Sequence, residues 1–210
     1  MPAAPTPYRA LLVDIDGVLY NWPASDAEIE TAHGLPEGIL RQIAFRRDLL
    51  TPAITGAITD EAWRAQIVAE LARTYPDSRT AEAVAMWTQR RGGLATDVLA
   101  LIDQLSDAIK VLLISNATSR LNSDLAELGL STHFYAVINS SEVGSIKPEP
   151  AIFHAALAAA DVTADQTLFV DDSAKNVAGA EKLGIRSHHF TGIDGFTAFL
   201  RAAGVLDQAS

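Results

Sequence analysis

The second half of the chain alternates short apolar segments with segments whose apolar residues recur at helical spacing. The apolar segments are residues 110–115, 136–139, 167–171 and 185–190, and the helical ones are 94–105, 118–128, 150–160, 175–183 and 194–203. Apolar strands that alternate with helices are typical of a parallel sheet with both faces covered. The pattern therefore predicts an α/β fold, in which an active site would lie at the carboxyl ends of the strands.

One more apolar segment, residues 10–14, stands apart near the start of the chain. Between it and the other strands, residues 21–93 show helical spacing and no strand-like alternation. The predicted helices there are 26–33, 36–49, 59–74 and 80–90, separated by Pro52, Gly56 and Pro76. We therefore expect an α/β core of residues 8–20 and 94–210, interrupted after its first strand by an all-α domain of residues 21–93. Residues 1–7 contain three prolines and are expected to be disordered.

The composition restricts the classes of partner and of chemistry. The chain has 26 acidic and 16 basic residues and a formal net charge of −10, which disfavours nucleic acid and anionic membranes as partners. Because no apolar stretch approaches the ~20 residues of a membrane span and the N-terminus lacks the regions of a signal peptide, we expect a soluble, cytoplasmic protein. The absence of cysteine excludes disulfides, thiolate catalysis and zinc–thiolate sites.

The first strand runs directly into two aspartates, Asp14 and Asp16. At this spacing both side chains point to the same side of the strand. Because two like charges on one face repel, the arrangement normally requires a metal ion or a shared proton. Gly17 then allows a sharp turn and a close approach to the backbone. The alternative is a strand that simply ends in acidic turn residues.

Polar residues also stand at the ends of other predicted strands. Ser115 and Asn116 end the second strand, Asp171 and Asp172 end the fourth, and Lys147 precedes a helix between them. Taken singly, the first two pairs could cap the helices that follow, and the lysine could lie in a solvated loop. These separate explanations would all have to be true at once, which is improbable. We therefore expect the residues to share one crevice with the first pair of aspartates.

This combination of motifs, in this order, resembles the haloacid dehalogenase (HAD) superfamily. The four motifs of that family appear here as Asp14-Ile15-Asp16-Gly17-Val18, Ser115-Asn116, Lys147-Pro148 and Asp171-Asp172. The resemblance covers the whole α/β core. It implies a Rossmann-like parallel sheet of strand order 5-4-1-2-3 with helices on both faces, a small hairpin flap near residues 18–22, and an α-helical cap domain formed by the inserted segment.

The resemblance also implies a reaction. Asp14 would attack phosphorus and form an aspartyl-phosphate. Asp16 would protonate the leaving alcohol and then deprotonate the water that hydrolyses the intermediate. Ser115 and the backbone amide of Asn116 would hold the phosphate oxygens, and Lys147 would neutralise charge on the transferring group.

A metal ion follows from the same resemblance. Asp14, Asp171, Asp172 and the backbone carbonyl of Asp16 would hold Mg²⁺, which prefers hard oxygen ligands. Asn176 would support this site from one turn further along. The charge count agrees, because one lysine cannot neutralise three carboxylates and a phosphate dianion.

The inserted segment is expected to close over the crevice and to contribute specificity. The candidate substrate-facing residues are Trp22, Phe45, Arg46 and Arg47, with the arginines placed to contact a second anionic group. The alternative is that the two arginines lie on a solvated helix face. Trp63 and Trp87 are interpreted as part of the core of the insert.

Asp16 distinguishes two branches of the family, because the dehalogenases lack an aspartate two residues after the nucleophile. The expected activity is therefore Mg²⁺-dependent hydrolysis of a small phosphorylated metabolite, for example a sugar phosphate. The alternatives are a phosphomutase, a 2-haloacid dehalogenase-type hydrolase, and a non-catalytic protein that binds a metabolite or phosphate. A receiver domain uses similar residues, but its acidic pair comes first in the chain. The sequence leaves open whether the protein is a monomer or a homodimer.

Overall fold

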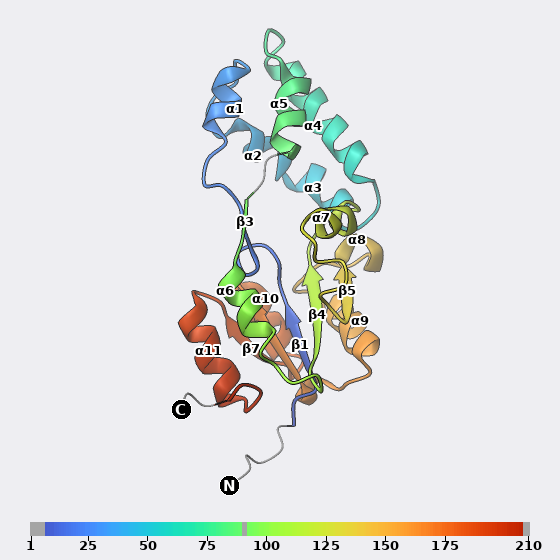
Figure 1. Cartoon of the computed structure of the whole chain (residues 1–210). Coiled ribbons are helices and arrows are strands. Elements are labelled where there is room, and N and C mark those ends of the chain that lie inside the picture. The colour runs from blue at the N-terminus through green and yellow to red at the C-terminus, as the bar shows by residue number, and fades with distance from the viewer. Residues whose placement is uncertain (1–6, 90–91, 208–210) are drawn as a thin grey trace.

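The computed structural model describes residues 7–89 and 92–207. The expected disorder of residues 1–7 therefore concerns residues that, apart from Pro7, lie outside the described part of the chain. Figure 1 shows a parallel sheet with helices packed on both faces, and a group of helices at one end of it.

Five strands form the parallel sheet. They are β1 (Ala10–Val13), β4 (Lys110–Ser115), β5 (Ala136–Asn139), β6 (Thr167–Asp171) and β7 (Arg186–His189), in the order β5-β4-β1-β6-β7. If the strands of this sheet alone are numbered along the chain, that order reads 5-4-1-2-3 from β7. All four residues of β1 are buried. The strand that precedes Asp14 is therefore the central one.

Helices cover both faces of the sheet, and the predicted α/β class is confirmed. They are α6 (Thr96–Ile102), α7 (Leu121–Glu127), α8 (Ser140–Val143), α9 (Pro150–Ala160), α10 (Ala174–Glu181) and α11 (Ile193–Ala202), with a 3₁₀ turn at Ala164–Gln166. Apolar residues of α6, α7 and α11 pack against Leu11 and Val13 of β1. Those of α9 and α10 pack with Leu12 on the opposite face, because neighbouring strand residues point to opposite sides.

Residues 22–89, here called the helical insert, contain five helices that pack around their own apolar cluster. These are α1 (Ala27–Ala32), α2 (Ile39–Ala44), α3 (Arg47–Ile54), α4 (Asp60–Thr74) and α5 (Thr80–Gln89). Leu40, Ile67 and Leu71 are fully buried in the cluster. The predicted helix 36–49 is in fact two helices, since Arg46 has an extended backbone at the start of α3. Among the described residues, no helix combines the length and the apolar character needed to cross a membrane.

Two short strands join the insert to the core. β2 (Tyr20–Asn21) pairs antiparallel with β3 (Gly93–Leu94), so the outgoing and returning chain lie side by side. The small hairpin flap expected near residues 18–22 is therefore present as a strand pair, but its second strand comes from residues 93–94. Residues 15–20 form a compact turn in which the Tyr20 N–H donates to the Ile15 carbonyl, and this turn directs β2 toward the returning strand.

Candidate active site

The carboxyl ends of β1, β4 and β6 bring three of the sequence motifs together. Val13 is in register with Leu113 on one side and with Val170 on the other. Asp14 is tied to the same edge, since its backbone N–H donates to the Val170 carbonyl at 3.1 Å. The aspartates of β1 and β6 and the serine of β4 therefore end the strands side by side.

Lys147 lies at the centre of this edge. Its Nζ is 2.7 Å from Asp14 Oδ1 and 2.7 Å from Asp171 Oδ2, and it donates to the Ile114 carbonyl at 2.9 Å. The lysine side chain is buried almost completely. One ammonium group thus holds two buried carboxylates, which would otherwise repel each other.

Asn116 fixes the loop that carries this lysine. Its Oδ1 accepts from the Lys147 backbone N–H at 2.6 Å, and its Nδ2 donates to the Lys147 carbonyl at 3.0 Å. The sequence pointed to the Asn116 backbone as a phosphate ligand, but it did not reveal this side-chain role. No local pattern could show it, because the two residues are brought together only by the fold.

Three carboxylates form a cluster that fits a divalent cation. Asp14, Asp171 and Asp172 each offer one oxygen, and these oxygens all lie within 4.8 Å of one another. Asn176 Nδ2 donates to both carboxylate oxygens of Asp171, at 3.0 and 3.1 Å, and so orients it. The donor set consists of hard oxygen atoms, which suits Mg²⁺.

Gly17 makes room for Asp172 in this cluster. A Cβ at position 17 would lie 2.3 Å from Asp172 Oδ2, and the glycine has a φ of +78° that disfavours other residues. The close approach predicted for this glycine is therefore made by a side chain of the fourth motif.

Ser115 has an unpartnered hydroxyl. The residue is 1% exposed, and its Oγ has no hydrogen-bond partner among the described residues. Buried hydroxyl groups are normally hydrogen-bonded, so such an atom at a strand end suits a ligand oxygen.

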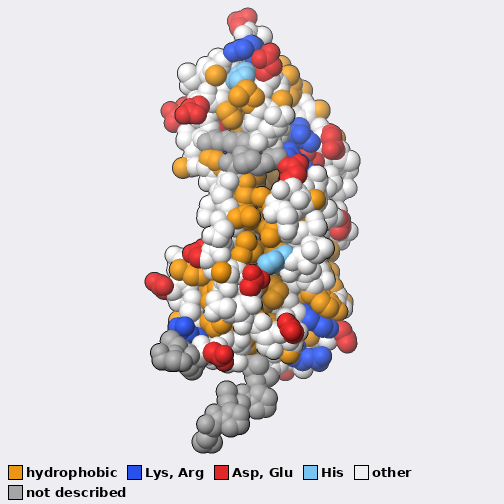
Figure 2. All heavy atoms as spheres, in the orientation of Figure 1, with side chains coloured by type: hydrophobic (Ala, Val, Ile, Leu, Met, Phe, Trp, Pro, Cys, Tyr) orange, Lys and Arg blue, Asp and Glu red, His pale blue; other side chains and the backbone are white. Residues whose placement is uncertain are grey.

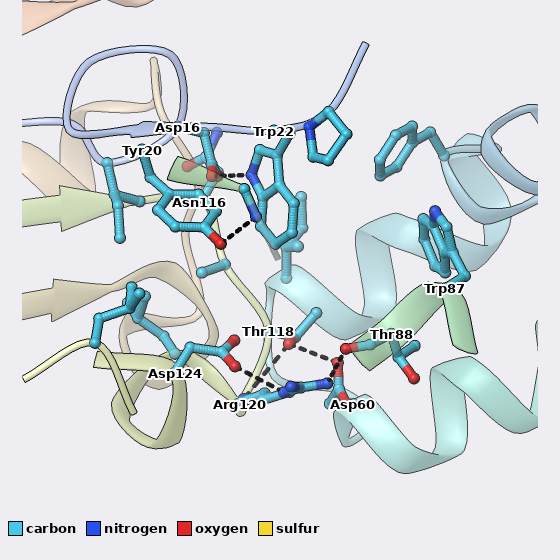
Figure 3. A pocket seen from close by; sticks show the side chains of 18 of the residues that line it. Asp16, Tyr20, Trp22, Asp60, Trp87, Thr88, Asn116, Thr118, Arg120 and Asp124 are labelled. Carbon is cyan, nitrogen blue, oxygen red and sulfur yellow. Dashed lines mark hydrogen bonds and ion pairs between the residues drawn. The ribbon is translucent and has the colours of Figure 1, made fainter. Parts of the chain in front are cut away.

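The side chain of Asp16 lines a cavity. Its Oδ1 accepts a hydrogen bond of 2.6 Å from Trp22 Nε1 (Figure 3). The three-carboxylate cluster does not include its side chain. The two aspartates of the first motif therefore meet different surroundings.

Burial shifts the pKa values of these groups. It raises the pKa of Asp14 from 3.8 to about 7, with Lys147 opposing the shift and Asp171 adding to it. Burial alone would lower the pKa of Lys147, but the carboxylates of Asp14 and Asp171 raise it above its ordinary value. The protein around Asp16 raises its pKa despite its contact with solvent in the cavity, and the bond from Trp22 opposes this. Without a metal ion, Asp14 is therefore partly protonated at neutral pH while Lys147 stays charged.

A cavity of about 850 Å³ extends from Asp16 and Asn116 toward the helical insert. In Figure 3, Trp22 lies on the side of the core and Trp87 on the side of the insert. Trp22 and Phe45, two of the candidate substrate-facing residues, line it. Trp63 and Trp87 pack within the insert as expected, and they also line the cavity.

The two candidate arginines lie elsewhere. Arg46 is held on the insert by Asp48 at 2.7 Å and by Glu70 at 2.8 Å, and neither it nor Arg47 is among the described lining residues. Arg41 and Arg120 line the cavity instead. The structure does not bring the expected pair, Arg46 and Arg47, to the cavity, and acidic neighbours on the insert hold Arg46.

Polar contacts join the insert to the core beside the cavity. Thr118 Oγ1 donates to Asp60 Oδ1 at 2.9 Å, and Arg120 Nη1 donates to the Thr88 carbonyl at 2.9 Å (Figure 3). On another side, Ser140 Oγ donates to the Ile54 carbonyl at 2.6 Å. These bonds hold the insert over the carboxyl edge of the sheet.

Comparisons with known proteins give consistent results. A family model described as haloacid dehalogenase-like hydrolase matches residues 8–184. A phosphoserine phosphatase from Thermus thermophilus is 35% identical over 117 residues, which are 55% of this chain and 41% of that protein. The chain thus spans less than half the length of the curated relatives it matches.

Two solved structures show the same fold. A predicted HAD-like family hydrolase from Porphyromonas gingivalis is 24% identical with a TM-score of 0.70, covering 92% of this chain and 98% of that one. A HAD family enzyme from Bacteroides thetaiotaomicron, in complex with magnesium and inorganic phosphate, is 24% identical with a TM-score of 0.68, covering 86% and 93%.

Proposed function

We propose that this chain, which belongs to the family of haloacid dehalogenase-like hydrolases, is a Mg²⁺-dependent phosphatase that hydrolyses a small phosphomonoester through an aspartyl-phosphate. The observation that carries the proposal is the division of the first motif. Asp14 lies beside Lys147 and the other carboxylates, whereas Asp16 faces the cavity. This division supports Asp14 as the nucleophile and Asp16 as the group that moves protons.

In the first step, a carboxylate oxygen of Asp14 attacks phosphorus, and the bond between phosphorus and the ester oxygen breaks. Asp16 gives its proton to the departing alkoxide. Its raised pKa favours the protonated form that this step requires. The Ser115 hydroxyl, the Asn116 backbone N–H and the Lys147 ammonium would receive the phosphate oxygens.

In the second step, water attacks the phosphorus of the aspartyl-phosphate and Asp16 accepts a proton from it. Inorganic phosphate leaves and Asp14 is regenerated. Mg²⁺, held by Asp14, Asp171, Asp172 and the Asp16 carbonyl, would supply positive charge against the phosphate oxygens. Lys147 keeps its proton in the free site because the carboxylates of Asp14 and Asp171 raise its pKa, and in the intermediate Asp171 and the phosphoryl oxygens would stabilise its charge.

The relatives support this choice. One curated relative is a phosphoserine phosphatase, and one structure of the same fold is a complex with magnesium and inorganic phosphate. The presence of Asp16 favours phosphoryl transfer over dehalogenation, because an ester at phosphorus needs an acid for its leaving group.

The test is phosphate release from a simple alkyl phosphate with Mg²⁺. Asp14→Asn should lose activity roughly a thousandfold or more, because the nucleophile is removed. Asp194→Asn is the matched control, since Asp194 is exposed on α11, and it should retain activity. Chelation by EDTA should stop turnover and added Mg²⁺ should restore it. Wild-type rates in Asp14→Asn would exclude the assigned nucleophile.

A further inference from the structure

The cavity begins at the residue that would face the leaving group. Asp16 and Asn116 line its core end, and it extends between the core and the insert with a volume of about 850 Å³. If Asp16 protonates the departing alkoxide, the alcohol portion of the substrate lies in this cavity. The residues that line the cavity therefore indicate what kind of alcohol it binds.

Aromatic side chains dominate both ends of the cavity. The ring centroids of Tyr20 and Trp22 lie 4.9 Å apart, with the rings edge to face, near Asp16. On the insert, the ring centroid of Trp87 lies 6.2 Å from that of Phe45 and 6.0 Å from that of Trp63. Aliphatic residues also line the cavity: Ile15, Leu50, Ile54, Leu94, Leu121 and Leu128.

Two of these aromatic rings are far more exposed than large apolar side chains usually are. Trp22 is 52% exposed and Phe45 is 54% exposed. Figure 2 shows apolar side chains gathered along the middle of the molecule, between the insert and the core. Covering such surface with an apolar ligand removes it from water, which is favourable at roughly 25 cal/mol per Å².

The two arginines that line the cavity are already paired with carboxylates. Arg41 contacts Asp26 at 2.6 Å and donates to the Pro23 carbonyl at 2.5 Å. Arg120 contacts Asp124 at 2.8 Å and donates to the Thr88 carbonyl. Each arginine among the described lining residues thus faces a carboxylate. A second anionic group on a substrate would have to displace it.

We infer that the preferred substrate is a phosphate monoester of a neutral, largely apolar alcohol that carries an aromatic ring, rather than of a sugar or an amino acid. The inference rests on the proposed function, because it places the leaving group beside Asp16. It replaces the sugar phosphate expected from the sequence. An alcohol with a quaternary ammonium group would also suit aromatic walls, but the cavity has the volume of a drug-sized ligand site and not of so small a group.

A panel of primary alkyl phosphates tests the inference. The esters are 2-(1-naphthyl)ethyl phosphate, ethyl phosphate, glucose 6-phosphate, phosphoserine and phosphocholine. All are esters of primary alcohols, so they share the type of bond that breaks. With Mg²⁺ present, kcat/KM for the naphthylethyl ester should exceed that of every other ester by about tenfold or more, from burial of the ring.

Substitution of a cavity-lining residue tests whether the preference for the naphthylethyl ester arises in the cavity. Phe45→Ala should lower the ratio of kcat/KM between the naphthylethyl and ethyl esters about tenfold, by removing one exposed ring of the wall. Tyr135→Ala is the matched control, because Tyr135 is 58% exposed and is not among the described lining residues; it should keep the wild-type ratio. Trp87→Ala and Met86→Ala, neighbours on α5, form a second such pair.

The outcomes separate the two proposals. If glucose 6-phosphate, phosphoserine or phosphocholine is hydrolysed as well as the naphthylethyl ester, the inference is overturned and the phosphatase stands. An unchanged ratio in Phe45→Ala would also overturn it. Failure to hydrolyse any ester, ethyl phosphate included, would overturn the proposed function and this inference with it.

Discussion

At the scale of single residues, the buried Lys147 ammonium controls the charge balance of the sheet edge. It is 2.7 Å from an oxygen of Asp14 and of Asp171. Lys147→Met should lower the free energy of unfolding of the metal-free protein by about 3–5 kcal/mol, because it leaves buried carboxylates without their partner. Urea unfolding at neutral pH measures this change.

Lys175→Met is the control for that substitution. Lys175 is exposed on α10, so its loss should change the unfolding free energy by less than about 0.5 kcal/mol. Equal effects of the two substitutions would mean that Lys147 does not stabilise the buried carboxylates of Asp14 and Asp171.

The two aspartates of the first motif should separate in function. Asp16→Asn should lower kcat about 10²–10⁴-fold, because it removes the proposed proton donor of the first step. It should keep the rise in Tm that Mg²⁺ causes, since its side chain is outside the carboxylate cluster. Asp172→Asn should lose that rise. A thermal melt with and without Mg²⁺, beside the kinetics, checks both; a loss of the Mg²⁺ effect in Asp16→Asn would contradict the division.

At the scale of elements, the end of α3 meets α8 across the boundary between insert and core. A Cβ on Gly56 would lie 2.0 Å from the Ser141 carbonyl oxygen, and Gly56 has a φ of +74°. Gly38 has a similar φ of +81°, but a Cβ there meets nothing within 4 Å. The two glycines thus differ in the contact and not in the backbone conformation.

Alanine at each position should therefore separate the free-energy cost of the left-handed backbone conformation from the cost of the clash with Ser141. Gly38→Ala should destabilise by about 1–2 kcal/mol, from the left-handed conformation alone. Gly56→Ala should cost more and should also lower kcat/KM, because the insert must shift from the core. Urea unfolding and steady-state kinetics measure both. Equal losses of stability would indicate that this contact does not hold the insert.

The sequence predicted the elements that are long enough to show a period. The segments 110–115, 136–139 and 167–171 are strands with those bounds, and helix 150–160 is α9. The strands β2 and β3 have two residues each, which is too few to show strand alternation, and α8 has four, which is little more than one helical turn.

The site followed from topology more than from local patterns. The rule that parallel strands end at one edge predicted the neighbours of Asp14. The cavity wall did not follow in this way. Arg46 is held by Glu70, and Arg41 lines the cavity beside Asp26; such pairs between separate helices cannot be read from spacing along the chain.

At the scale of the whole molecule, stability should depend on both pH and Mg²⁺. Burial raises the pKa of Asp14 from 3.8 to about 7. Between these values the folded chain binds a proton that the unfolded chain has lost, so the free energy of unfolding falls as the pH rises through this window. The proposed Mg²⁺ site requires the ionised carboxylate of Asp14, so binding of the ion would release that proton.

The rise in Tm on adding Mg²⁺ should therefore be larger near about pH 8 than near about pH 6. Melting curves at both pH values, with EDTA or with Mg²⁺, measure it. Asp14→Asn should flatten the dependence, because the titrating group is gone. A Mg²⁺ effect that shrinks toward high pH would contradict this linkage.

The central position of β1 has a consequence for how the protein is made. Ala10 pairs with Lys110 on one side and with Thr167 on the other. On the ribosome, Leu11, Leu12 and Val13 are synthesised long before β4 and β6. The helices of the insert, in contrast, pack against one another and do not need those later strands. Contacts between such distant residues form slowly, and an unpaired apolar strand is a template for aggregation. The strand that leads to Asp14 is thus synthesised first and shielded late, and the carboxylate cluster is complete only when translation has passed residue 172.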